Sequence, residues 1–291
     1  MRRAIALSAF GLGATSPNPP VGCVIIDAEG RIAGEGYHER KGEAHAEAQA
    51  LAAAGRRAAG GTAVVTLEPC NHHGRTPPCR QALIDASVSR VVIALIDPTS
   101  RGEGGAAALR AHGIEVVTGV LADEARFVLG TWSAALGTGR PVITWPYRLT
   151  GRGIEALADD TADARLLRLN ADAVLREHAR VEEAVPGSHG AGILQITDAG
   201  SGADAHAVVK RLYEGGARSL LLHGGESVAG PFLAAGLVDH VLVWLAARRS
   251  SDRPREPLPW PLLPPGFTIA GVVRTAGFVR IEAWRGPDEV P

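Results

Sequence analysis

The sequence predicts an α/β protein of two domains, the first of which is a three-layer α/β/α sandwich. Over residues 1–136, short β-branched runs alternate with segments of high helix propensity, the pattern of strands covered by helices. A Gly-Pro cluster, Gly137-Thr138-Gly139-Arg140-Pro141, then separates the last of these helices from a new strand at 142–145. We therefore expect one domain over 1–136 and a second over 137–291.

The elements of the first domain are expected in the order strand, strand, helix, strand, helix, strand, helix, strand, after an opening helix over 2–13. The strands are predicted at 21–26, 31–36, 62–67, 91–96 and 116–120. The helices include 45–54, 79–86 and 121–136. Asp27-Ala28-Glu29-Gly30 is a turn sequence, so the first two strands form a hairpin, and Cys23 in the first of them is expected in the core.

Composition excludes several classes of partner. The chain has 291 residues, 46% of them hydrophobic, which suffices for two buried cores. Its 30 basic and 31 acidic residues give a net charge of −1, and only 4% of residues are aromatic, which argues against a nucleic-acid partner. The apolar runs are too short for a membrane span or a signal peptide. Three cysteines cannot form a disulfide framework, and metal-binding thiolates suit the cytoplasm.

A candidate metal site lies between His45 and Cys79. Zinc prefers imidazole and thiolate, and His45, Cys70 and Cys79 supply three such ligands, which leaves a fourth position for water, as in catalytic sites. Glu47 completes an H-x-E plus P-C…C pattern in which the carboxylate carries protons during deamination. The alternatives are a structural zinc knuckle or a pair of reduced core cysteines, but a closed structural site needs a fourth protein ligand and has no use for Glu47.

Two helices should begin at this metal. His45 and Glu47 lie in the first turn of one predicted helix and Cys79 starts another, so the positive ends of both helix dipoles favour thiolate and hydroxide. Residues 71–78, between the two cysteines, must form a loop that leaves the metal and returns. This loop is polar and cationic, and it is therefore a candidate for contacting the substrate.

The motifs of the first domain resemble the deaminase half of the bifunctional riboflavin-biosynthesis deaminase/reductase family. The resemblance spans residues 1 to about 135. It rests on Ser16-Pro17-Asn18-Pro19-Pro20-Val21-Gly22, Gly34-Glu35-Gly36-Tyr37-His38, His45-Ala46-Glu47, Thr66-Leu67-Glu68-Pro69-Cys70 and His72-His73-Gly74-Arg75-Thr76-Pro77-Pro78-Cys79. It implies a cytidine-deaminase-like fold, zinc, and a small phosphorylated pyrimidine as substrate.

The resemblance also implies substrate contacts. Asn18, stiffened by prolines on both sides, would present its amide to the pyrimidine edge, although an ordinary Pro-rich turn is the alternative. Arg75, with His38 and His72, would bind the ribose-phosphate tail; a solvent-facing loop histidine is the alternative for His38. Asp97 would also face the substrate. The chain departs from the family at Asn71, where Cys is frequent, and at Asp97-Pro98-Thr99-Ser100, where the family has Asp-Pro-Asn-Pro.

In the second domain, the resemblance implies a truncated dihydrofolate-reductase-like fold whose cofactor site has degenerated. Pro146 stands where the family has a Lys, and Arg176-Glu177-His178-Ala179-Arg180 stands where a Gly-x-Gly-Thr loop is expected. Such large side chains keep the backbone from approaching a pyrophosphate as glycine does. His223 replaces an expected Glu before Gly224-Gly225. We therefore expect no NADP(H), and a domain retained as a homodimer interface.

Four functions remain open from the sequence. The first is zinc-dependent deamination of a ribose-phosphate-bearing aminopyrimidine in riboflavin synthesis, without reductase activity. The second is the same reaction on a diverted pyrimidine of a specialised pathway, which Thr99 and the eroded second domain favour. The third is the complete bifunctional deaminase/NADPH reductase. The fourth is a zinc-bearing scaffold that assembles partners, against which the intact Glu47 counts.

Overall fold

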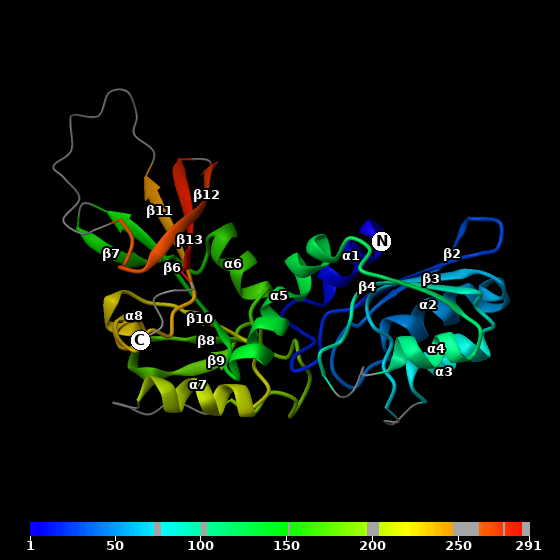
Figure 1. Cartoon of the computed structure of the whole chain (residues 1–291). Helices are drawn as coiled ribbons and strands as arrows, with labels where there is room; N and C mark the ends of the chain where they lie inside the picture. The colour runs from blue at the N-terminus through cyan, green and yellow to red at the C-terminus, as the bar shows by residue number, and fades with distance from the viewer. Residues whose placement is uncertain are drawn as a thin grey trace. The chain divides into compact units, whose positions relative to one another are not determined.

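The computed structural model describes residues 1–72, 77–99, 104–150, 152–196, 204–246, 262–275 and 277–286. The chain divides into two compact units, Met1–Ser133 and Ala134–Pro291 (Figure 1). Helix α5 (Ala122–Thr138) runs through this division, and its end overlaps the Gly-Pro cluster at 137–141.

The described residues of the first unit form a five-stranded sheet in the order β2-β1-β3-β4-β5. The strands are β1 (Gly22–Ile26), β2 (Ile32–Tyr37), β3 (Thr62–Leu67), β4 (Arg90–Leu95) and β5 (Glu115–Thr118). β1 and β2 form the predicted antiparallel hairpin, whereas β3, β4 and β5 run parallel. All five lie close to their predicted ranges, and in β1, β3 and β4 most of the β-branched residues that predicted the strand are buried.

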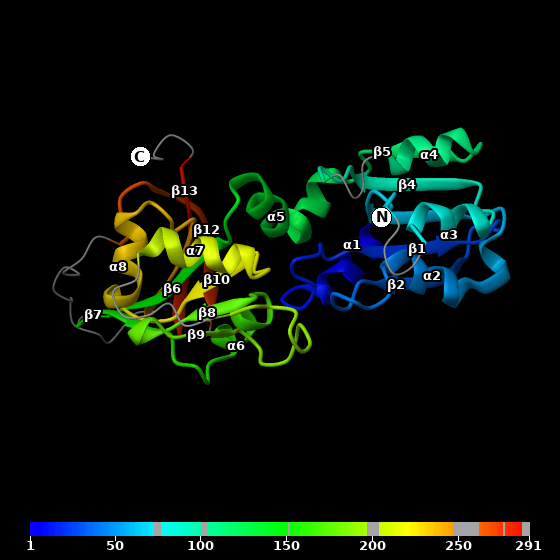
Figure 2. The same cartoon turned by 90° about the horizontal axis from the view of Figure 1, so that it is seen from below.

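Helices cover both faces of this sheet and make three layers (Figures 1 and 2). α2 (Ala46–Ala54), α3 (Cys79–Asp85) and α4 (Gly105–Ala111) lie on one face. Their apolar residues pack against every second residue of the strands, including Cys23, which is fully buried as predicted. α2 lies very close to β2, since a Cβ added to Gly36 would be 2.5 Å from the carbonyl oxygen of Ala46.

The opposite face of the sheet is covered by α1 (Arg2–Ser8), whose Ala4 packs on Val24 and Val64. This opening helix is shorter than the predicted range of 2–13, since the chain continues as the 3-10 helix η1 (Ala9–Gly11). Gly11, within η1, lies close to another segment: a Cβ there would be 2.5 Å from the backbone oxygen of His38.

The described residues of the second unit form an eight-stranded sheet in the order β12-β13-β11-β6-β10-β8-β9, with β7 paired to β6. The strands are β6 (Val142–Thr150), β7 (Gly153–Ala156), β8 (Ala173–Leu175), β9 (Val181–Glu183), β10 (Ser219–Leu222), β11 (His240–Ala246), β12 (Phe267–Thr275) and β13 (Phe278–Arg285). β8, β10, β6 and β11 are parallel neighbours. β12 and β13 pair antiparallel at one edge of the sheet.

Strand β6 continues beyond its predicted end at Trp145 and passes through Pro146 to Thr150. Proline is rare inside a sheet because it cannot donate to the hydrogen-bond ladder. On one side of β6, however, β10 pairs as far as Thr144 and β7 takes over from Tyr147. Pro146 lies at this change of neighbour, where the loss of its N–H is tolerated.

The second unit also has helices on both faces of its sheet (Figure 2). α7 (Ala205–Glu214) and α8 (Glu226–Ala234) pack with the apolar strand residues in the larger core. α6 (Ala162–Leu169) covers the other face, where Ala164 packs with Leu242 and Trp244. Within the described ranges, no helix combines the length and apolarity needed to cross a bilayer.

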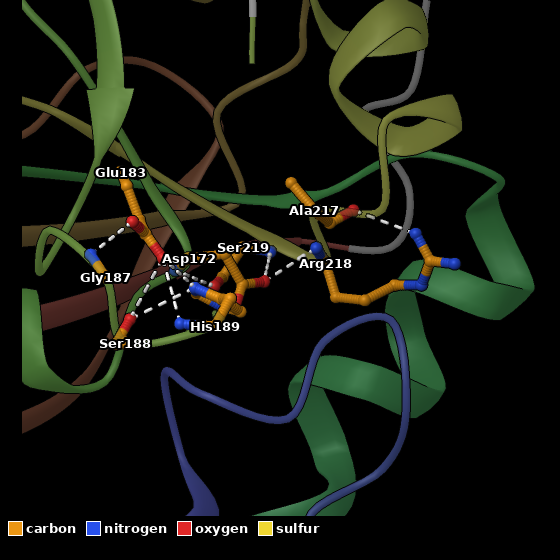
Figure 3. Close-up of polar contacts among 8 residues, drawn as sticks. All are labelled: Asp172, Glu183, Gly187, Ser188, His189, Ala217, Arg218 and Ser219. Atoms are coloured by element: carbon orange, nitrogen blue, oxygen red, sulfur yellow. Dashed lines mark hydrogen bonds and ion pairs between the residues drawn. The ribbon is translucent and has the colours of Figure 1, made fainter. Parts of the chain in front are cut away.

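A buried polar cluster ties the loop after β9 to the beginnings of β8 and β10 (Figure 3). The His189 ring is fully buried; its Nδ1 lies 2.7 Å from Glu183 Oε1 and its Nε2 lies 3.1 Å from Asp172 Oδ1. Asp172 Oδ2 accepts the backbone N–H groups of Arg218 and Ser219. Burial lowers the pKa of His189, but the two carboxylates outweigh it and raise the pKa above its usual value. Both ring nitrogens of His189 thus lie against carboxylate oxygens, an arrangement that favours the protonated ring.

Candidate active site

The first unit brings together His45, Cys70 and Cys79. His45 is the N-cap residue of α2, and Cys79 is the first residue of α3. Cys70 follows the end of β3, and its backbone oxygen accepts the N–H of Arg80. Two helix N-termini therefore meet at these side chains, and their dipoles favour negative charge there.

The geometry of this ligand cluster (His45, Cys70 and Cys79) fits zinc. The three donor atoms lie within 4.8 Å of one another. His45 Nδ1 is 3.2 Å from Cys79 Sγ and 3.7 Å from Cys70 Sγ. Tetrahedral zinc with Zn–N of about 2.0 Å and Zn–S of about 2.3 Å would separate nitrogen from sulfur by about 3.6 Å, which the two distances bracket. One imidazole and two thiols are also the soft donors that zinc prefers.

The two thiols of the ligand cluster share a proton. A hydrogen bond from Cys79 lowers the pKa of Cys70 to about 4, and the same bond raises the pKa of Cys79, so the opposite shifts describe one interaction. The lowered pKa of Cys70 has independent support, because the backbone N–H of Cys79 donates to Cys70 Sγ at 3.2 Å. Metal ligands bind as thiolates, and zinc would therefore displace the shared proton.

Glu47 lies in the first turn of α2 and is 3% exposed. Burial raises the pKa of its carboxyl group, and the negative charge of Cys70 acts in the same direction, while His45 opposes them. The Cys79 thiol hydrogen-bonds to this carboxylate. A buried carboxyl group with a raised pKa, next to a metal-ligand set, is suited to accept a proton and to return it.

Asn18 and His38 form a hydrogen-bonded pair beside the ligand cluster. His38 is 3% exposed, and its Nδ1 lies 3.3 Å from the carbonyl oxygen of Ala44, which can only accept. Nδ1 therefore carries the proton, and burial, the main cause, lowers the pKa of His38 to about 4. Its Nε2 must then accept from Asn18 Nδ2 at 3.2 Å. The edge of the His38 ring also packs on His45. These contacts orient the Asn18 amide; they differ from the expected phosphate contact of His38.

The other predicted substrate residues are only partly described. Arg75 lies outside the described residues, as do His73, Gly74 and Thr76. Within the described part of the chain, His72 Nδ1 is buried without a hydrogen-bond partner. Asp97 follows β4, and its Oδ1 accepts both the N–H and the hydroxyl of Thr99, at 2.8 and 2.7 Å. Thr99, where the family has Asn, thus uses its hydroxyl within this turn.

Glu68 is a buried residue of this region to which the sequence analysis gave no role. It is 5% exposed, and its carboxylate accepts the backbone N–H groups of Asp97 and Ala106. Its place in Thr66-Leu67-Glu68-Pro69-Cys70 was the only signal in the sequence, since both partners belong to later segments.

In the second unit, charged side chains gather after β8, where a cofactor loop was expected. We call Asp159, Arg168, Arg176, Glu182 and His223 the Asp159 network. Arg168 and Arg176 contact the Asp159 carboxylate at 2.7 and 3.1 Å, and His223 Nδ1 lies 3.4 Å from it. Arg176 also donates to Glu182 at 2.6 Å. The charges of this network are therefore paired with one another.

The backbone next to the Asp159 network is unusual. His178 and Ala179 have φ values of 60° and 57°, in the left-handed region that glycine adopts readily and other residues rarely. Each such residue costs about 1 kcal/mol. The short helix η3 (Glu177–Ala179) that contains them packs on α8.

Comparisons with known protein families match both units. Residues 1–95 match the cytidine and deoxycytidylate deaminase zinc-binding region, and residues 140–248 match the RibD C-terminal domain. The chain resembles the diaminohydroxyphosphoribosylaminopyrimidine deaminase of Buchnera aphidicola, with 51% identity over 142 residues, or 48% of this chain and 96% of that protein.

Other similarities extend over both units. The riboflavin biosynthesis protein RibD of Mycobacterium tuberculosis is 37% identical over 276 residues, which cover 80% of each chain. A crystal structure of the Thermotoga maritima diaminohydroxyphosphoribosylaminopyrimidine deaminase/5-amino-6-(5-phosphoribosylamino)uracil reductase matches with a TM-score of 0.78 and 26% identity. It covers 98% of this chain and 97% of that one. The chain belongs to the RibD family of riboflavin biosynthesis proteins, with a cytidine-deaminase-like zinc-binding domain and a reductase-like C-terminal domain.

Proposed function

We propose that this protein deaminates a ribose-phosphate-bearing aminopyrimidine by zinc-dependent hydrolysis, and that it has no reductase activity. The observation that carries the proposal is the burial of Glu47 beside three zinc-type ligands that lie within 4.8 Å of one another. A structural zinc site or a scaffold would not require a buried acid at that place.

Zinc, when bound by His45, Cys70 and Cys79, supplies the Lewis acidity that makes water nucleophilic near neutral pH. Glu47 takes a proton from the attacking water and returns it to the departing nitrogen. The oxygen adds to the amine-bearing ring carbon, the C–N bond breaks, and ammonia leaves with the proton that Glu47 delivers. Because Glu47 is buried, the proton it carries does not exchange freely with solvent during this transfer.

Substrate recognition follows from the hydrogen-bond roles of the neighbouring side chains. His38 accepts from Asn18 Nδ2, so the Asn18 carbonyl oxygen is the atom that would accept an N–H from the pyrimidine. Asp97 would accept a further N–H or hydroxyl. His72 and Arg75 would bind the phosphate-bearing tail, because guanidinium and imidazole donors match phosphate oxygens.

The loss of reductase activity is supported by the second unit's own residues. A pyrophosphate is bound where the backbone can approach it closely and where hydrogen-bond donors are free to contact its oxygens. After β8 the chain instead carries Arg176, whose guanidinium is held by Asp159 and Glu182. The residues present after β8 therefore do not fit the pyrophosphate of NADPH.

The complete bifunctional deaminase/reductase is the second candidate. It is favoured by the match of residues 140–248 to the RibD C-terminal domain and by the full-length similarity to the Thermotoga structure.

We further propose a cytoplasmic homodimer, in which the second unit supplies the interface. Sedimentation of the full chain and of residues 1–136 would test this, and a dimeric truncated chain would contradict it.

The deaminase proposal is tested by measuring ammonia release from diaminohydroxyphosphoribosylaminopyrimidine, and from its dephosphorylated form, with zinc-loaded protein. We expect ammonia from both compounds, with a clearly lower KM for the phosphorylated one. No ammonia from either would overturn the proposal, and equal kinetics would remove the phosphate-binding role of the loop at 71–78.

A further inference from the structure

Glu68 lies at the centre of a junction between three separate segments of the first unit. Its Oε1 accepts the N–H of Ala106 at 2.8 Å, and its Oε2 accepts the N–H of Asp97 at 3.3 Å. Its own N–H donates to the backbone oxygen of Leu95 at the end of β4. One side chain thus connects the end of β3, the turn after β4 and the first turn of α4.

The Glu68 side chain is largely removed from solvent. Glu68 is 5% exposed, and among the described residues no basic side chain forms an ion pair with it. Two backbone amides and the N-terminus of α4 compensate for part of the lost hydration. A neutral side chain could fill the same space. We therefore attribute the carboxylate at this position to the two backbone amides that donate to it.

The segments of this junction are packed too closely to move independently. A Cβ on Gly105 would be 2.2 Å from the backbone oxygen of Pro69, and one on Gly104 would be 3.3 Å from Asn71 Nδ2. The start of α4 therefore lies directly on the chain between Glu68 and Asn71. That stretch includes Cys70, a member of the ligand cluster.

The third segment, the turn after β4, is held from two sides. Glu68 holds the backbone N–H of Asp97, and Thr99 donates its N–H and hydroxyl to Asp97 Oδ1. Together these bonds fix both the main chain and one carboxylate oxygen of Asp97. The Asp97 side chain therefore has a defined direction relative to Cys70.

We infer that Glu68 is a positioning residue for the proposed deamination: it fixes the Asp97–Thr99 turn relative to the metal ligand Cys70. The inference rests on the proposed function, in which Asp97 contacts the pyrimidine. Glu68 acts through Asp97, because its two carboxylate oxygens accept the backbone N–H groups of Asp97 and Ala106. Thr99 supports the same positioning, because its N–H and hydroxyl donate to Asp97 Oδ1.

A double-mutant cycle between Glu68→Gln and Asp97→Asn tests this inference, with zinc content and kinetics measured for each protein. Glutamine keeps one acceptor oxygen but faces the second amide with an NH2 group. We expect undiminished zinc and a fall in kcat/KM of about 10- to 100-fold, since small misplacements of substrate-orienting groups have effects of this size. In the Asp97→Asn background, Glu68→Gln should change kcat/KM by less than about twofold.

Two further variants keep the test decisive. Thr99→Val removes the hydroxyl from a partly exposed position, and it should lower kcat/KM in the same direction with the same dependence on Asp97. Asp27→Asn is the matched control, because Asp27 is also a buried carboxylate that accepts two backbone N–H groups, within the β1–β2 turn. It should leave kcat/KM unchanged.

Additive losses in an active enzyme, or wild-type kinetics in both Glu68→Gln and Thr99→Val, would overturn the inference and leave the proposed function intact. Loss of zinc from Glu68→Gln would show a role in supporting the metal instead. If the wild-type protein releases no ammonia, the proposed function fails and the inference falls with it.

Discussion

Polar groups are arranged in opposite ways in the ligand cluster of the first unit and in the Asp159 network of the second. In the ligand cluster, one nitrogen and two sulfurs converge, and two thiols must share a single proton. In the Asp159 network, two guanidinium groups and an imidazole lie against carboxylates at 2.6–3.4 Å. The first arrangement offers converging donor atoms to a metal cation, whereas the charged groups of the second are paired with one another.

This difference is the basis for the proposal that the first unit is active and that the second lacks reductase activity. The left-handed backbone at His178 and Ala179 is retained although neither residue is glycine. Strain of this kind persists where the surrounding structure imposes it. We interpret residues 176–180 as a loop whose backbone keeps the left-handed conformation typical of glycine, while its side chains occupy the space that a ligand would need.

The largest expected effect is that of Glu47→Gln. The variant should retain zinc but lose about two to four orders of magnitude in turnover, the size of a general acid/base contribution. Ammonia release and metal analysis on the same sample check this. The control is Glu115→Gln, which alters an exposed acid on β5 and should leave both unchanged. Near-normal turnover in Glu47→Gln would remove that residue from the mechanism.

The next largest effect is expected from removal of a zinc ligand. Cys79→Ala should lose most of its bound zinc, because two protein ligands hold the metal far less tightly than three. Metal analysis after dialysis measures the loss. Cys23→Ala provides the comparison, as Cys23 is a fully buried cysteine in β1 that belongs to the core. If both variants kept equal zinc, the ligand assignment would be wrong.

A smaller effect is expected from Arg75→Ala in the loop between the two cysteines. Binding energy from a phosphate remote from the reacting carbon is shared by ground and transition states. KM should therefore rise more than kcat falls, with kcat/KM reduced by about 10- to 100-fold. Kinetics on the phosphorylated substrate measure this, and an unchanged KM would count against the assignment.

The smallest expected effect concerns the His189 cluster of the second unit. The pKa of His189 is raised in the folded protein, so its stabilisation is fully present below the usual pKa of 6.5 and is lost as the pH rises through the raised value. The pKa of Glu183 is lowered, with burial opposed by the N–H groups of His189 and Gly187, so its stabilisation is lost only in acid. Stability should therefore be greatest in mildly acidic solution.

Hydrogen exchange of residues 187–189 and 218–219 is the local readout for this cluster. In the wild-type protein, exchange beyond the intrinsic pH effect should accelerate above pH of about 6.5. His189→Gln should cost about 1 kcal/mol or more and flatten this dependence. An unchanged pH profile in His189→Gln would show that the ring is not an imidazolium.

Local sequence patterns predicted much of the first unit. The β-branched runs gave its strands, the Asp27–Gly30 turn gave the hairpin, and the spacing of His45, Cys70 and Cys79 predicted a ligand set that the fold does bring together. These features depend on residues close in sequence or on ligand chemistry, both of which are visible in a single chain.

The features that the sequence did not predict depend on contacts between distant segments. The neutral state of His38 requires its burial against Asn18 and Ala44, and the role of Glu68 requires Asp97 and Ala106. The passage of β6 through Pro146 depends on which strand lies beside it, and no local rule specifies that neighbour.

The most direct test of the contrast is one reaction in which ammonia and NADPH are measured together. Zinc-loaded protein would be incubated with diaminohydroxyphosphoribosylaminopyrimidine and NADPH. We expect ammonia to accumulate while the NADPH absorbance stays constant, because the proposed zinc site with Glu47 is complete and the paired charges of the Asp159 network do not fit the cofactor. NADPH oxidation in step with ammonia release would contradict it and establish the second unit as a working reductase.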